Sequence, residues 1–135
     1  VHGFCKEEAD NQELAPFVAQ LTELNKEWGD LTMKIGMSAM KDRNEVGSAS
    51  VDYLMYSGYV TLAYLWAKMA KASQVALAAG TTEEEFYKAK LTTARFYFSR
   101  ILPRTKSHAA TMVAGSDLWI LMQNTSRSNQ CLIKA

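Results

Sequence analysis

The residues that most often carry chemistry are few in this chain of 135 residues. Its two histidines are His2 and His108, and neither has a glutamate three residues before it. A di-iron site in a helical bundle needs Glu-x-x-His pairs of that kind on facing helices. Cys5 and Cys131 stand near opposite ends, without the paired spacing of a zinc site or the dense spacing of a disulfide scaffold. The sequence therefore predicts no metal site and two free thiols.

Three consecutive glutamates, 83–85, could be imagined as the paired acids of an active site. Thr82 and Glu85 have the spacing of a capping box, in which each side chain bonds a backbone N–H of the other residue. Carboxylates also interact favourably with a helix N-terminus, and Glu84 can pair with Lys88 one turn later. We interpret this stretch as a helix start. Since there is also no Gly-rich phosphate loop and no nucleophile motif, we assign no catalytic residue and leave cofactor-binding residues unknown.

Two further sets of side chains could bind a ligand. The tyrosines of the second predicted helix could line a ligand-binding groove, because the hydroxyl end of a tyrosine often stays in contact with water. The basic residues after position 86 could meet a nucleotide phosphate. Core packing explains the first set and a solvated helix face explains the second, and we favour both of these interpretations. The sets are Tyr53, Tyr56, Tyr59, Tyr64 with Trp66, and Lys88, Lys90, Arg95, Arg100, Arg104, Lys106.

Composition is that of an ordinary globular domain, with 48% hydrophobic and 21% charged residues. The length predicts one domain, and a net charge of +1 argues against a nucleic-acid or other polyanion partner. No apolar stretch is long enough to span a membrane and no signal peptide opens the chain, so we expect a cytoplasmic protein with no membrane partner. The chain lacks an initiator Met, which suits a fragment of a larger protein.

Helical periodicity dominates the chain. Apolar residues from Leu14 to Ile35 recur on one face and predict a helix over 12–41, with Asp10 or Asn11 as a cap. A second helix is predicted over 48–80, with Gly80 at its C-terminal end. Its apolar residues cover more of the helix circumference than those of the first helix.

A third helix is predicted from position 82. Pro103 has no N–H to donate, so we expect a kink there rather than an end, because an apolar face resumes after it. Gly115 followed by Ser116 indicates a stop and a short fourth helix to position 123. The predicted fold is all-α: an antiparallel up-and-down bundle of three long helices plus a short C-terminal helix over 12–123. We expect 1–11 to be flexible and 124–135 to be disordered.

Three aromatic residues lie together between two arginines in the third helix. Tyr97 continues the main apolar stripe, while Phe96 and Phe98 point to opposite sides of it because neighbouring side chains are about 100° apart. One phenylalanine can face a partner helix, and the other is pushed outward. We therefore predict an interface at Phe96, Phe98, Arg95 and Arg100, and a homo-oligomer, most simply a two-fold dimer. The alternative is that the N-terminal segment or the fourth helix covers this site within one chain.

Two long stretches resemble a known family. They are "ASVDYLMYSGYVTLAYLWAKMAKAS" at 49–73 and "FYKAKLTTARFYFSRILPRTKSHAATMVAGSDLWILM" at 86–122. They are similar to the C-terminal domain of long-form bacterial acyl-CoA dehydrogenases, the subgroup that includes 3-methylmercaptopropionyl-CoA dehydrogenase. The resemblance runs from about residue 10 to residue 122, and its most specific parts are 59–69 and 95–104.

The resemblance implies a flavoprotein context. Such enzymes use FAD to oxidise an acyl-CoA to the 2,3-enoyl-CoA: a glutamate takes the α-proton and N5 of the flavin accepts hydride. Their flavin and substrate sites, and the "YEGT"-like segment near the catalytic glutamate, lie upstream of this domain, and none of those motifs occurs here. The resemblance thus implies a domain without catalytic activity or FAD of its own, packed on the catalytic body or a neighbouring subunit. The alternative is an independent helical protein–protein interaction module.

Overall fold

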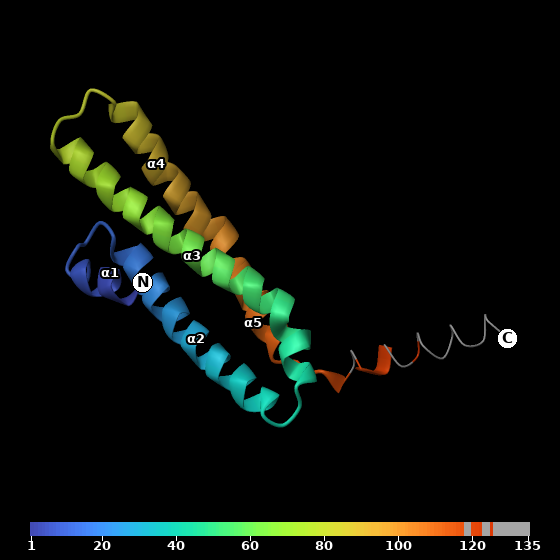
Figure 1. Ribbon diagram of the computed structural model, residues 1–135. Helices are drawn as coiled ribbons and strands as arrows, with labels where there is room; N and C mark the ends of the chain where they lie inside the picture. The colour runs from blue at the N-terminus through green and yellow to red at the C-terminus, as the bar shows by residue number, and fades with distance from the viewer. Residues whose placement is uncertain (118–119, 123–124, 126–135) are drawn as a thin grey trace.

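The computed structural model describes residues 1–117, 120–122 and 125. In these residues the chain is helical and contains no strand, which confirms the all-α fold (Figure 1). The helices are α1 (His2–Glu7), α2 (Ala15–Ala39), α3 (Asn44–Ala78), α4 (Glu84–Phe96) and α5 (Thr105–Met112). Between α4 and α5 the backbone stays helical, first as a π-helix (Tyr97–Ile101) and then as a 3₁₀-helix (Leu102–Arg104).

The long helix α3 is the centre of the bundle. Helix α2 lies along it in the opposite direction, and α4 and α5 together run back along its other side (Figure 1). The short connections at 40–43 and 79–83 require neighbouring helices to be antiparallel, as expected for an up-and-down bundle. Helix α1 folds against the start of α2.

The core has two parts, one towards each end of the bundle. The part next to α1 includes Leu14 and Leu21 of α2's face and Phe98 and Leu102 of the π and 3₁₀ segments. There the fully buried side chains of α3 are small, which lets the helices approach closely: Ala63, Ala67 and Ala70. The other part contains Leu31, Ala49, Tyr56, Val60, Ala109 and Met112.

The C-terminal end of α3 and the N-terminal end of α4 test two predictions made from the sequence. Gly80 has a φ of 75°, and its N–H and that of Thr81 bond to the carbonyls of Leu77 and Ala76. This is the Schellman pattern, so Gly80 terminates α3 as predicted. The capping box at Thr82 is wrong. The Thr81 hydroxyl accepts the Glu83 N–H at 3.2 Å, and the N-cap is Glu83 rather than Thr82, without a side-chain hydrogen bond.

Residues 1–11, expected to be a flexible segment, contain a short helix. Phe4 of α1 meets the ring of Tyr64 edge-on, with centroids 5.7 Å apart, and Cys5 is buried beside it. Glu8, just after α1, is buried and forms an ion pair with Lys71 of α3. Because α1 is only six residues long, it has no readable periodicity, and these tertiary contacts position it.

The ion pair makes the docking of α1 pH-dependent. Hydrogen bonds from Lys71 and then Asn11 hold the pKa of Glu8 below its ordinary value of 4.5. The carboxylate's contribution to stability is therefore complete above pH 4.5 and lost as the pH falls through the lowered pKa. We expect Glu8→Gln to destabilise the chain near neutral pH, and the difference from wild type to shrink below pH 4.5. Urea unfolding of both proteins across this range measures it, and a pH-independent difference would contradict it.

The backbone around Pro103 changes helix type without opening into a loop. The N–H of Leu102 reaches the carbonyl of Tyr97, five residues back, and the Thr105 hydroxyl donates to the Leu102 carbonyl at 2.7 Å. Pro103 stands in the 3₁₀ segment, where no N–H can complete an α-helical bond. The proline thus lies inside a continuous helical run, as the sequence predicts.

Restoring that N–H should regularise the segment. We expect Pro103→Ala to leave the bundle folded and to straighten the helix from α4 into α5, because the stated cause of the irregularity is removed. Amide hydrogen exchange of residues 98–104 should slow in the variant. If the π-helix persists unchanged, the packing of the buried Phe98 and Leu102, not the proline, holds it in place.

The end of α5 is tied back to the turn between α2 and α3. Gly115 has a φ of 90°, which supports the predicted stop. The N–H of Ser116 donates to Glu45 at 3.0 Å, and its hydroxyl lies 2.8 Å from the same carboxylate. Within the predicted fourth helix, residues 117 and 120–122 are helical, and the Ile120 N–H donates to the Ser116 carbonyl at 3.0 Å. Residues 118, 119 and 123, and the predicted tail from 124 except residue 125, lie outside the described residues.

Candidate functional site

The three aromatics between the arginines separate as the helical geometry predicts. Phe98 is 2% exposed, and its ring lies 4.5 Å from that of Phe17 on α2. The Tyr97 hydroxyl donates to the Tyr59 carbonyl of α3 at 3.0 Å. Phe96 is 57% exposed on the outer side of α4. One phenylalanine is inside the bundle and the other is outside.

This placement corrects the predicted interface at one position. Phe98 cannot be an interface residue, because α2 lies on its side of α4 and Phe17 covers its ring. Phe96, Arg95 and Arg100 do lie on the surface. Helix α1, which packs on α2 and α3, does not cover Phe96.

Basic residues precede and follow Phe96 along the chain. The chain from Phe86 to Met112 has no Asp or Glu, and its lysines and arginines are those named in the sequence analysis. Lys88 pairs with Glu84 at 2.6 Å, as predicted, and Lys90 lies over the Phe86 ring at 5.2 Å. In the described part of the chain no carboxylate lies within ion-pair distance of the other four. We call the exposed set the basic face: Arg95, Phe96, Arg100, Arg104 and Lys106.

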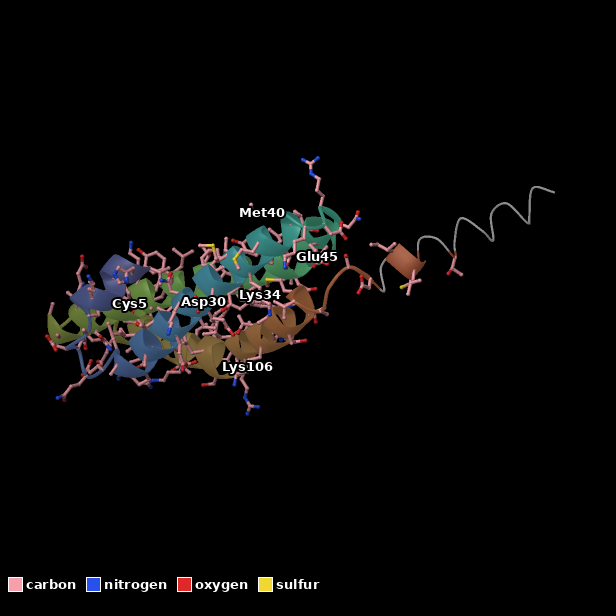
Figure 2. The ribbon with its side chains drawn as sticks, turned by 90° about the horizontal axis from the view of Figure 1, so that it is seen from below. Cys5, Asp30, Lys34, Met40, Glu45 and Lys106 are labelled. Carbon is pink, nitrogen blue, oxygen red and sulfur yellow. The ribbon has the colours of Figure 1, made fainter. Side chains whose placement is uncertain are left out.

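A cleft of about 480 Å³ lies between α2 and the 102–106 segment. Figure 2 looks onto this side, with Asp30 and Lys34 on α2 and Lys106 on α5. Leu24 and Leu102 line the cleft together with two carboxylates, Glu23 and Glu27, and one cation, Lys106, so the charge of its lining is net negative. FAD and coenzyme A both carry phosphates, which these carboxylates would repel. The cleft therefore does not fit either group, and we derive no catalytic step from it.

The tyrosines of α3 mainly serve the core. Tyr56 has no exposed surface, and its hydroxyl donates to Glu27 at 2.6 Å. Burial, followed by this hydrogen bond, raises the pKa of Tyr56 well above its ordinary value of 10. Burial likewise raises the pKa of Tyr97 to about 12. Tyr53 bonds the Thr32 hydroxyl of α2 at 2.9 Å. These hydroxyl groups hold helices together, which supports the interpretation as core packing.

Sequence reasoning missed one polar pair. His108 Nδ1 of α5 lies 2.7 Å from Asp52 Oδ1 of α3, and the ring of Tyr59 stacks on the imidazole at 5.6 Å. The two residues are 56 positions apart and belong to no motif, so no sequence signal could have paired them. No Ser or Cys in the described residues hydrogen-bonds this histidine, and we interpret the pair as a brace between α3 and α5.

The described residues contain no group of three or more His, Cys, Asp or Glu side chains placed to hold a metal ion. In the same part of the chain, none of the helices combines the length and the apolar character needed to cross a bilayer.

Together, the packed helices and the open basic face define a helical domain without an assembled catalytic centre among its described residues. A family model described as acetyl-CoA dehydrogenase C-terminal like matches residues 1–123, and the chain belongs to this family. The match includes α1, which the sequence resemblance from residue 10 onward did not cover. A search of curated proteins finds no match.

Proposed function

We propose that this chain is the non-catalytic C-terminal domain of an FAD-dependent acyl-CoA dehydrogenase of the long-form bacterial subgroup that includes 3-methylmercaptopropionyl-CoA dehydrogenase. The family match supports the enzyme context. The stretches at 59–69 and 95–104 support the subgroup. FAD and the oxidation of acyl-CoA belong to the catalytic body in the cytoplasm. The protein's part in such chemistry is to position the flavin, and the cleft among the described residues of this domain does not fit it.

The domain's own role is to pack against that catalytic body. The observation that carries this role is Phe96, a large ring that is 57% exposed in a stretch with four exposed cations. In the described residues these cations have no carboxylate within ion-pair distance. An aromatic anchor beside arginines is typical of residues that dominate binding energy at interfaces. The partner surface should therefore be acidic and offer an apolar pocket for the ring.

The encoding gene gives a first test. We expect its reading frame to continue upstream through a flavin-binding acyl-CoA dehydrogenase core. A short independent gene for this chain would instead favour the interaction module, the alternative that the sequence left open.

A substitution in the basic face tests the contact itself. In the enzyme that carries this domain, we expect Phe96→Glu to lower the thermal midpoint, because it buries a carboxylate in the contact. The same change in the isolated chain should have almost no effect, since the side chain is exposed there.

Phe86→Glu is the matched control, because Phe86 is 53% exposed on the same helix and lies outside the basic face. It should leave both midpoints nearly unchanged. Equal effects of the two substitutions in the enzyme would contradict a contact at Phe96.

A further inference from the structure

The cleft between α2 and the 102–106 segment lies where two parts of the bundle are not closed against each other. Helix α2 on one side, and the segment from α4 to α5 on the other, each pack chiefly on α3. The cleft between them has a volume of about 480 Å³. Sites that bind small ligands in proteins usually have volumes of roughly 300–1,000 Å³. The cleft is therefore large enough for a ligand of that kind.

Two carboxylates stand on the α2 wall of this cleft. Glu23 and Glu27 are four residues apart, so their side chains leave the same face of the helix with their Cβ atoms about 5–6 Å from each other. Glu27 is held in position, because its Oε2 accepts the hydroxyl of the buried Tyr56 at 2.6 Å. In the part of the chain that the structure describes, neither glutamate has a lysine or arginine within ion-pair distance. This wall thus presents two negative charges that a cationic ligand can neutralise.

The rest of the lining is largely apolar. Leu24 lies on α2 between the two glutamates, and Leu102 and Pro103 line the cleft from the 3₁₀ segment. Pro103 is exposed and has no N–H, so the wall offers no backbone donor at that position. An alkyl chain can lie along such a surface while its charged end stays at the carboxylates, as the stems of lysine and arginine side chains do.

Lys106 makes the two walls of the cleft opposite in charge. It lines the wall that faces α2, and it also belongs to the basic face. A second cation on the ligand would be repelled there, whereas a carboxylate would pair with the ammonium. On the α2 side, a planar guanidinium with five N–H donors can bond two carboxylates at once, which suits it better than a compact ammonium.

We propose that this cleft binds an arginine side chain that has a carboxylate close to it, presented by the same partner that docks on the basic face. The guanidinium lies between Glu23 and Glu27, and the carboxylate pairs with Lys106. Because Lys106 is common to both surfaces, one partner surface covers both. The inference rests on the proposed function for the identity of that partner, the catalytic body, while the binding chemistry rests on the cleft alone.

Titration of the chain with N-acetylarginine, followed by ¹H–¹⁵N NMR, tests the binding chemistry, because this probe carries both a guanidinium and a carboxylate. We expect saturable shifts of the amide signals of residues 23–27 and 102–106. N-acetylcitrulline has nearly the same shape without the positive charge, and it should bind about tenfold more weakly, since hydrogen bonds to charged groups are the stronger ones. Equal binding of the two probes, or no saturation with N-acetylarginine, would overturn the proposal.

Variants of the chain locate the site. Glu23→Gln should weaken N-acetylarginine binding by about tenfold. Asp30→Asn is the matched control, because it removes a carboxylate from the same helix outside the cleft, and it should change the affinity little. Lys106→Gln should weaken the binding of N-acetylarginine but not that of N-acetylargininamide, which lacks the carboxylate. Similar losses for Glu23→Gln and Asp30→Asn would mean a general attraction to an acidic helix and no site in the cleft.

The partner is tested in the enzyme that carries this domain. Glu23→Lys should lower the thermal midpoint of the enzyme, since it sets a cation against the arginine, and leave that of the isolated chain nearly unchanged. If Phe96→Glu lowers the midpoint of the enzyme and Glu23→Lys does not, the domain docks without the cleft; this inference is then wrong while the proposed function holds. The reverse result would support the cleft contact and count against docking through the basic face.

Discussion

Replacing Phe98 with alanine is expected to lower the free energy of unfolding by about 3–5 kcal/mol. The ring is 2% exposed and packs on Phe17, so its removal leaves a cavity where α2, α3 and the π-helix meet. Urea denaturation followed by circular dichroism measures the loss.

Phe96→Ala is the matched control two positions away. Because this ring is 57% exposed, the substitution should change stability by less than about 0.5 kcal/mol. Similar losses for the two variants would mean that both rings are buried, and the basic face would then lose its apolar anchor.

Enlarging Ala67 is expected to cost about 1–3 kcal/mol. Ala67 has no exposed surface and lies in the core part where the fully buried side chains of α3 are alanines, so Ala67→Leu must push a neighbouring helix away. Thermal unfolding measures the effect. Ala19→Leu, at an exposed position of α2, adds the same atoms without this crowding and should be nearly neutral. If Ala67→Leu were equally neutral, the close approach of the helices at this level would be wrong.

Periodicity was enough to predict the long helices, because each buries a continuous face. Gly80 could be predicted as the end of α3 since a left-handed residue there favours glycine. Helix α1 could not be predicted from the sequence, because Phe4 and Glu8 are held in place by distant residues of α3. The capping box was not formed: the N-cap is Glu83, and the nearby threonine that accepts a backbone N–H is Thr81, from Glu83.

The candidate site was predictable only in part. The 100° step between residues requires Phe96 and Phe98 to diverge, but it cannot say which of them α2 will cover. The sequence also shows that apolar residues cover much of the circumference of the second helix. Only the structure shows that Asp52 and Lys71 of this helix pair with His108 and Glu8, while Lys68 is exposed and lies over the ring of Tyr64.

Purification and assay of the chain itself test the central claim most directly. As a non-catalytic domain of a flavoenzyme, it should purify colourless and show no acyl-CoA oxidation with an artificial electron acceptor, because its described residues offer no fitting flavin site and no catalytic constellation. Stoichiometric yellow flavin bound to the chain, or turnover that one substitution within it abolishes, would contradict the account.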